Sequence, residues 1–364
     1  MNGRSRLRRN LKLPIVDFPE DMDVDIAKQN AIDGTMSSLD FVKQYLTNKL
    51  IFPPDPSEHF FDHSSLLDVE ALGSGTFGTV RTMVYQPMEK AMAVKRIRLK
   101  NNGTDDGVSK SMDRVRQEVE ASKAASNCPN IVAFFGITFY DGDAWMCMEL
   151  MDLSLDKLYH IAHDIVKVTF DECTLAAVAG ATINALEHMK KKHQIIHRDV
   201  KPSNILIRKT GEVKLCDFGI CGYLQNSIAT TIDAGCPPYM APERLTPNKG
   251  GYNIKSDVWS LGISMVEIAN GRFPYDTIKN APIFEQMKTI VHGDPPLIDV
   301  RLSVPMRNFI MACIVKDCEK RADFETLKQT EVYRQHNAPE TTEGVSQFVC
   351  TMYIHKDYLP PARA

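Results

Sequence analysis

This chain is constrained most by the stretch His197-Arg198-Asp199-Val200-Lys201-Pro202-Ser203-Asn204 and by Asp217-Phe218-Gly219, which begins thirteen residues after Asn204. Two carboxylates, an ammonium and an amide at these intervals can position a nucleotide, its Mg2+ and an attacking hydroxyl. Taken singly, an Asp often caps a turn, and Asp-Phe-Gly is a common loop tripeptide. Order, spacing and residue type together reduce these ordinary alternatives to roughly one in a hundred or less.

Each residue of this stretch can be given one role, because phosphoryl transfer asks a protein mainly for alignment and for neutralisation of phosphate charge. Asp199 is predicted to accept the hydrogen bond of the substrate hydroxyl. Asn204 and Asp217 are predicted to supply the oxygen ligands that Mg2+ prefers. Lys201 is predicted to contact the transferring phosphate.

Composition describes an ordinary globular protein of one large or two smaller domains, with 364 residues, 43% hydrophobic and 24% charged. The net charge of -3 argues against a general nucleic-acid binder, and no apolar run reaches the ~18 residues of a membrane span. Nine cysteines without a Cys-x-x-Cys pair indicate reduced thiols and no zinc site. These features predict a cytoplasmic protein, and a basic N-terminal cluster leaves nuclear entry open.

A glycine-rich segment, 72–80, has the pattern Gly-x-Gly-x-x-Gly-x-Val, which lets backbone amides lie over phosphates. Alone it could also open a dinucleotide-binding unit. That alternative requires a helix next, whereas 80–84 and 91–97 are predicted as strands. The residues predicted to cover the nucleotide are Leu72, Gly73, Ser74, Gly75, Thr76, Phe77, Gly78 and Val80, with Ala93 on the second strand.

Lys95, in Ala93-Val94-Lys95, is predicted to contact the α- and β-phosphates of the nucleotide. Its orienting carboxylate is expected on the helix predicted over 109–126, where Glu118 is the first choice and Glu120 the rival. The alternative for Glu118 is a surface ion pair with Arg114 one turn earlier.

Two lobes are predicted from the remaining periodicity. Residues 130–140 and 144–148 are predicted as strands that complete a small, mostly β lobe. Met148 is then expected at the back of the nucleotide pocket, and the backbone of Glu149-Leu150-Met151 is expected to meet the adenine. Beyond residue 154 the pattern becomes helical, over 155–162, 174–190 and 256–269, and the last of these is apolar nearly all round.

These motifs, in this order over about residues 66–334, resemble the signature set of protein kinases. The resemblance implies an α+β bilobal fold, with a mostly β lobe over 66–150 and a larger mostly α lobe over 151–334. More narrowly, 146–152, 216–224 and 227–236 look like the dual-specificity mitogen-activated protein (MAP) kinase kinases. The Ser-x-Ala-x-Thr spacing at 227–231 resembles their stress-activated branch, whereas the branch acting on extracellular-signal-regulated kinases usually has two serines and a Pro-rich insert.

The resemblance implies that ATP and Mg2+ are used to phosphorylate both Thr and Tyr of a stress-activated MAP kinase. It implies activation by an upstream kinase at Ser227 and Thr231, with Thr230 as a competing site, and it places Cys216 on the nucleotide pocket. Pro237 stands where stress-branch relatives tend to carry a basic residue, which leaves the choice among stress-activated MAP kinases open.

The N-terminal tail, 1–62, begins with a basic cluster and a run of alternating apolar residues: Arg4, Arg6, Arg8, Arg9, Lys12, then Leu11, Leu13 and Ile15. Alone, 4–15 could be a docking peptide, a nuclear-import patch or a solvated tail. The resemblance implies a docking site for the substrate MAP kinase. Residues 38–50 are predicted as a short amphipathic helix. The segment from Thr326 to Tyr353, with the C-terminal region 335–364, resembles a docking segment for the upstream kinase.

Two classes of function are compatible with these features. One is an active kinase, and the other is a kinase-shaped scaffold that binds pathway partners without catalysis. A scaffold is expected to have lost at least one of four residues, and all four are present: Lys95, Asp199, Asn204 and Asp217.

Overall fold

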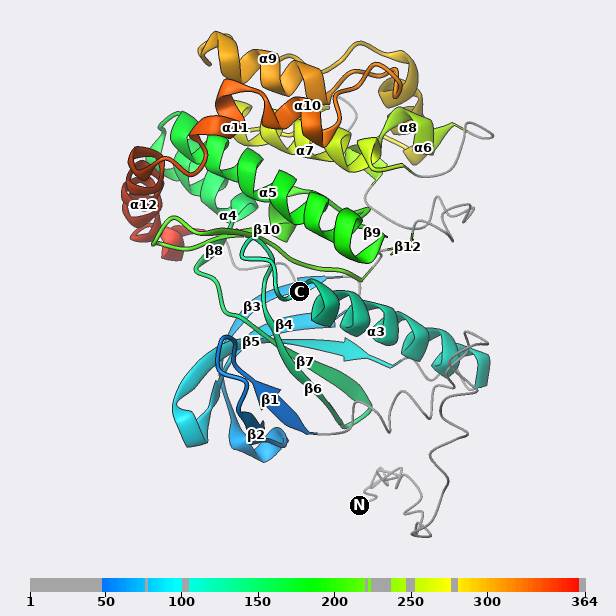
Figure 1. Cartoon of the computed structure of the whole chain (residues 1–364), viewed down its shortest axis with the longest axis vertical. Helices are drawn as coiled ribbons and strands as arrows, with labels where there is room; N and C mark the ends of the chain where they lie inside the picture. Colours follow the sequence, from blue (N-terminus) through cyan, green and yellow to red (C-terminus); the bar gives the residue numbers. More distant parts are fainter. Residues whose placement is uncertain are drawn as a thin grey trace, which may run out of the picture.

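A computed structural model describes residues 48–75, 78–99, 105–219, 222–223, 237–246, 253–275 and 281–359. These residues form a sheet-rich lobe and a larger helical lobe (Figure 1), as expected for the bilobal fold. The predicted docking segment 4–15, the predicted phosphorylation sites Ser227 and Thr231, and the loop residues Thr76 and Phe77 lie outside the described residues.

The N-terminal lobe is built on a five-stranded antiparallel sheet of order β3-β4-β5-β7-β6. Its strands are β3 (Leu66–Gly75), β4 (Gly78–Tyr85), β5 (Lys90–Arg98), β6 (Phe134–Tyr140) and β7 (Asp143–Met148). Helix α3 (Asp105–Ala125) buries Val115 and Val119 against Ile137 and Met146 of the sheet. This packing presents Glu118, one turn along from Val115, to the neighbourhood of Lys95 on β5.

The predicted helix over 38–50 is wrong at its C-terminal end. Lys49–Ile51 is strand β1, paired with β2 (Glu58–Phe60), and 38–47 lies outside the described residues. Leu50 is fully buried in a cluster with Phe61, Met83 and Trp145. β1 lies so close to β6 that a Cβ on Gly136 would stand 2.3 Å from the carbonyl of Lys49. Burial against the sheet therefore overrides the helical spacing of the leucines.

Two other predicted boundaries also moved. The strand predicted from 130 begins at Phe134, because Ile131 instead bridges Leu215 and Val132 donates to the Leu215 carbonyl at 3.0 Å. The helix predicted over 155–162 is α4 (Leu155–His160), which continues as a π-helix over Ile161–Val166.

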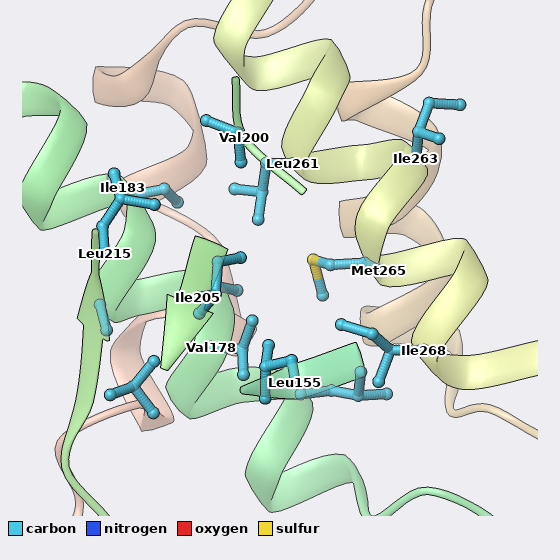
Figure 2. Close-up of a cluster of buried hydrophobic side chains, with 14 of the residues drawn as sticks. Leu155, Val178, Ile183, Val200, Ile205, Leu215, Leu261, Ile263, Met265 and Ile268 are labelled. Carbon is cyan, nitrogen blue, oxygen red and sulfur yellow. The ribbon is translucent and has the colours of Figure 1, made fainter. Parts of the chain in front are cut away.

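The C-terminal lobe is organised around α5 (Glu172–His193) and α7 (Lys255–Asn270). Every residue of α7 from Ser256 to Ala269 is buried, so its all-round apolar sequence is explained by a central position. Figure 2 shows Leu261, Met265 and Ile268 of α7 facing Val178 of α5 across this core.

Short strands at the lobe junction are β8 (Leu153–Ser154), β9 (Ile195–Ile196), β10 (Ile205–Ile207), β11 (Val213–Leu215) and β12 (Gly222–Tyr223). The remaining α-helices of the lobe are α6 (Pro242–Leu245), α8 (Ile283–His292), α9 (Val304–Cys313), α10 (Phe324–Lys328), α11 (Glu331–Gln335) and α12 (Pro339–Tyr353). In the described part of the chain, every helix is too short or too polar to cross a membrane.

The last helix, α12, lies against α5 rather than standing apart from the lobe (Figure 1). Val345, Val349 and Met352 are buried, and the rings of Phe348 and Phe170 meet edge-on at 5.1 Å between centroids. One face of the C-terminal region is therefore packed on the core of the C-terminal lobe.

Candidate active site

A buried lysine between two carboxylates joins the lobes. Lys95 Nζ donates to Glu118 Oε1 at 2.5 Å and to Asp217 Oδ1 at 2.8 Å. β5 supplies the lysine, α3 supplies Glu118, and the loop after β11 supplies Asp217. Of the two candidates on the helix, Glu118 forms an ion pair with Lys95. The cation that acts on Glu120 is Arg116 instead.

Burial opposes the charge on Lys95, but the two carboxylates outweigh it and hold the pKa of the ammonium above its ordinary value. Burial also opposes ionisation of Asp217, yet the lysine holds the pKa of this carboxyl below its usual range. For Glu118 burial and the charge of Asp217 prevail over Lys95, so its pKa is raised. At neutral pH the site therefore holds a charged Lys95, which suits an anionic phosphate, and an ionised Asp217, which suits a cation.

The catalytic loop brings together the other three residues singled out in the sequence. Lys201 Nζ donates to Asp199 Oδ2 at 2.7 Å. Asn204 Nδ2 donates to the same Oδ2 at 2.9 Å and to the Asp199 carbonyl at 2.8 Å. These contacts orient the Asp199 carboxylate and direct the amide nitrogen of Asn204 inward, which leaves the amide oxygen as the group suited to a metal ion.

Asp257 supports this loop from the buried helix α7, a role that local sequence reasoning missed. Its two carboxylate oxygens each accept a backbone N–H at 3.0 Å, one from His197 and one from Arg198. Arg198 has φ of 71°, a strained conformation for a residue with a side chain. Burial raises the pKa of Asp257 despite the nearby His197. The helix also buries Glu267, so an acid in a mostly apolar helix did not by itself identify the residue that meets the catalytic loop.

The Asp217-Phe218-Gly219 segment is tied to the catalytic loop at two points. The Cys216 N–H donates to the Asn204 carbonyl at 2.9 Å, and a ring nitrogen of His197 lies 3.1 Å from the Cys216 carbonyl. Phe218 is buried, and its ring meets that of His197 edge-on at 5.5 Å between centroids. These contacts hold Asp217, whose φ is 66°, in the position where it meets Lys95.

The glycine-rich hairpin is formed by β3 and β4, whose register pairs Gly73 with Val80 and Gly75 with Gly78. Gly78 is required sterically, because its φ is 148° and a Cβ would stand 1.9 Å from the carbonyl oxygen of Arg96. Lys157 Nζ, on α4, donates to the Leu72 carbonyl at 2.8 Å and so links the hairpin to the other lobe. This link joins residues far apart in the chain and was not predicted.

The predicted adenine-binding segment lies where the lobes meet. Met148 pairs with Ala93 across the sheet, and Met151 is buried. The Glu149 N–H donates to the Ala133 carbonyl at 2.9 Å, and the Glu149 side chain is held by Lys214 at 2.9 Å. The adenine contact predicted for the backbone of 149–151 stays a prediction, and among the described backbone hydrogen bonds none uses the Glu149 carbonyl.

Glu243 and Arg321 form a buried ion pair beneath the site. Nη1 and Nη2 of Arg321 donate to the two oxygens of Glu243 at 2.7 and 2.9 Å, and the Arg321 side chain is 0% exposed. Its guanidinium lies over Trp259, 5.2 Å from the ring centroid. Burial opposes ionisation of Glu243, but Arg321 holds the pKa of this carboxyl below its usual range.

The oxygen donors present fit a divalent ion held jointly with phosphates. Among the described residues no group of three or more His, Cys, Asp or Glu side chains gathers to hold a metal ion. Asp217 and Asn204 would supply two oxygen ligands, which matches the few that Mg2+ takes from protein when a nucleotide supplies others. The sequence-predicted pair is thus chemically suited to that ion.

Cys216 is expected to react slowly with electrophiles and to be protected by nucleotide. Burial raises the pKa of its thiol, so little thiolate exists at neutral pH, while its neighbour Asp217 faces the site. The measurement is the rate of labelling of Cys216 by mass spectrometry, with and without saturating ATP. Equal rates in both conditions would contradict a place for Cys216 on the nucleotide pocket.

Comparison with known proteins agrees with this site. The family model "Protein kinase domain" matches residues 66–333. The chain is therefore a protein kinase, an enzyme that uses ATP together with a divalent metal ion.

Three curated relatives narrow the class. Over 310 residues, 84% of this chain and 83% of the relative, the chain is 42% identical to "MAP kinase kinase mkk-4" of Caenorhabditis elegans. It is 42% identical to "Dual specificity mitogen-activated protein kinase kinase sek-1" of the same organism, over 72% of this chain and 77% of that protein. It is 38% identical to "Dual specificity mitogen-activated protein kinase kinase hemipterous" of Drosophila melanogaster, over 73% of this chain and 22% of that longer protein.

The chain belongs to the dual-specificity MAP kinase kinases, and the predicted assignment to their stress-activated branch is confirmed.

Proposed function

We propose that this enzyme transfers the γ-phosphoryl group of ATP to both the Thr and the Tyr of the activation loop of a stress-activated MAP kinase. The observation that most supports an active enzyme is that Lys95 donates hydrogen bonds to both Glu118 and Asp217. In the catalytic loop, Asn204 also donates a hydrogen bond to the Asp199 carboxylate. Burying an ammonium between two carboxylates carries a desolvation penalty. A non-catalytic scaffold would have no need of such a cluster, whereas an enzyme uses the charges to bind phosphate and metal.

In the proposed mechanism, the substrate hydroxyl donates its proton to Asp199 as its oxygen bonds to the γ-phosphorus and ADP leaves. Lys201, held by Asp199 at 2.7 Å, neutralises charge on the transferring group, and Lys95 aligns the α- and β-phosphates. Asn204 and Asp217 would hold Mg2+, and the bound ion would supply positive charge against the phosphates.

Phosphorylation-site mapping tests this function directly. The activated enzyme is incubated with ATP and with several unphosphorylated MAP kinases, and modified residues are identified by mass spectrometry. We expect one Thr and one Tyr of the same activation loop to be modified in a stress-activated MAP kinase. Modification of the Thr alone would contradict dual specificity, and no transfer to any of the MAP kinases would favour the scaffold.

Acidic replacement of Ser227 and Thr231 together is expected to raise basal activity by about tenfold or more, since each added charge can recruit cations and order the loop. Arg198 is the first such cation, because it adjoins Asp199. Replacement of both residues by Ala should abolish activation by an upstream kinase, measured as transfer to a MAP kinase. Full activation of the double-Ala protein, with phosphate only on Thr230, would assign the switch elsewhere.

Removal of residues 1–16 is expected to lower kcat/KM for an intact MAP kinase by about ten- to a hundredfold, because the tail contributes binding away from the active site. Activity on a short generic peptide should be unchanged. The defect should shrink at high salt, which screens the five basic residues of the segment. An equal loss on both substrates would implicate the tail in folding or in regulation instead.

The segment 326–353 is proposed to bind the upstream kinase through the outward face of α12, because Val345 and Val349 are committed to the core. The exposed side chains on that face include Glu343, Gln347 and Thr351. We also propose a cytoplasmic enzyme that can enter the nucleus, since the basic cluster at 4–12 has the composition of an import signal.

A further inference from the structure

An apolar groove on the C-terminal lobe, far along the chain from the catalytic residues, has no role in the proposed reaction. It has a volume of about 740 Å³ and lies between α9 and the neighbouring segments 295–298 and 314–316. Leu297 is 86% exposed, Val304 58% and Met311 50%. Val304 and Met311 are two turns apart on α9, so they extend one apolar face along the groove.

The groove is also cationic. Its lining contains Arg307 and Lys316 and, among the described residues that form it, no Asp or Glu. The Nε of Arg307 is buried and finds no hydrogen-bond partner among the described residues. Burial lowers the pKa of Lys316, although Asp294 acts in the opposite direction. Lys316 Nζ donates to the Gly293 carbonyl, so the incompletely satisfied cation of the groove is the Arg307 guanidinium. An apolar groove with such a cation fits a peptide that carries both apolar side chains and carboxylates.

The chain contains such a peptide at 16–25, Val-Asp-Phe-Pro-Glu-Asp-Met-Asp-Val-Asp. In an extended backbone, alternate side chains point to opposite sides. Val16, Phe18, Met22 and Val24 then fall on one side together with Glu20, and the four aspartates fall on the other side with Pro19. One strand thus presents an apolar edge for the groove and a carboxylate, Glu20, in the middle of that edge.

We propose that residues 16–25 dock as an extended strand in the groove formed by α9, 295–298 and 314–316 of the same molecule. Strand β1 and helix α9 lie at opposite ends of the molecule (Figure 1), and the straight diameter of a compact chain of this length is roughly 55 Å. The chain from residue 25 to residue 48 can span about 75 Å when extended, so docking requires a nearly extended linker that runs over the surface. Docking would hold the preceding segment 4–15 at the C-terminal lobe. The anchoring itself does not depend on whether 4–15 binds a MAP kinase.

Photo-crosslinking in the full-length protein tests this docking. Phe18 is replaced by p-benzoylphenylalanine, the sample is a mixture of 15N-labelled and unlabelled protein, and crosslinked peptides are identified by mass spectrometry. We expect crosslinks to residues 295–316 within one isotopic form. The same probe at Pro19, on the opposite side of the strand, is expected to give fewer crosslinks to these residues.

Met311→Glu places a carboxylate against the acidic strand and should reduce the crosslink by about tenfold. Leu67→Glu is the matched control, because Leu67 is 52% exposed but lies on β3 of the other lobe. Crosslinks of mixed isotopic form would assign the groove to a second copy and overturn the proposal. It would equally be overturned by crosslinks elsewhere, by none, or by an unchanged yield in Met311→Glu. Phosphoryl transfer is not part of this measurement, so the outcome is separate from that of the MAP kinase assay.

Discussion

Asp199→Ala is expected to lower the rate of phosphoryl transfer by about a hundred- to ten-thousandfold, the range of a positioned general base. The folded protein should persist, because Asp199 orients Lys201 and Asn204 rather than filling the core. The measurement is kcat for a MAP kinase substrate, together with thermal unfolding. Residual activity within tenfold of the wild type, or about 1.4 kcal/mol in barrier height, would remove Asp199 from the mechanism.

Lys95→Met provides the contrasting case, because its side chain is both catalytic and structural. The substitution should abolish activity to a similar degree, but it also leaves the buried carboxylate of Glu118 and the partly buried carboxylate of Asp217 without their cation. We therefore expect a loss of folding stability of a few kcal/mol, roughly 3 to 5. Adding Glu118→Gln should recover part of that stability and none of the activity. Full stability in Lys95→Met alone would contradict the buried triad.

Arg321→Met is expected to lower the free energy of unfolding by about 3 to 5 kcal/mol, because it leaves the Glu243 carboxylate buried without its cation. Arg321 is fully buried, and it also donates to the backbone carbonyls of Val315 and Lys255 at 2.8 Å. Its neighbour Lys320 is the matched control: the side chain is 80% exposed and 3.6 Å from Asp317, so Lys320→Met should change stability by less than about 1 kcal/mol. Denaturant unfolding of both variants makes the comparison.

The difference in unfolding free energy between the wild type and Arg321→Met should depend on pH in one direction. In the wild type the pKa of Glu243 is lower in the folded state than in the unfolded state. The pair's contribution is therefore present above the unfolded pKa, about 4.3, and is lost as pH falls through the lower folded pKa. The stability difference between wild type and Arg321→Met should be largest near neutral pH and should narrow in acid. A difference that widens on acidification would contradict the assigned ion pair.

Much of the site could be predicted because its chemistry is local in the chain. Asp199, Lys201 and Asn204 share one short loop, so their mutual contacts follow from their spacing. The long helices α5 and α7 were predicted because their apolar periodicity extends over several turns. Glu118 was predicted as the first choice on the helix that follows Lys95, and the structure decided between it and Glu120.

Other features depended on contacts between distant parts of the chain. Asp257 binds the His197 backbone across 60 residues, and Arg321 binds Glu243 across 78. Neither pairing has a local signal, because a buried acid or arginine has no periodicity that identifies its partner. The same holds for Leu50, whose spacing indicates a helix but which the β sheet buries as part of a strand.

The reaction chemistry and the two-lobed fold could be predicted from the residues alone, because both depend on residue types at short, regular intervals. The buried charges that support the catalytic loop, and the packing of the segment before the kinase domain, became visible in the folded chain. The same is true of the apolar face on the C-terminal lobe that remains exposed. The physical reason is that burial and charge pairing are settled by the packing of elements far apart in the chain, and the same local pattern can be stabilised in more than one environment.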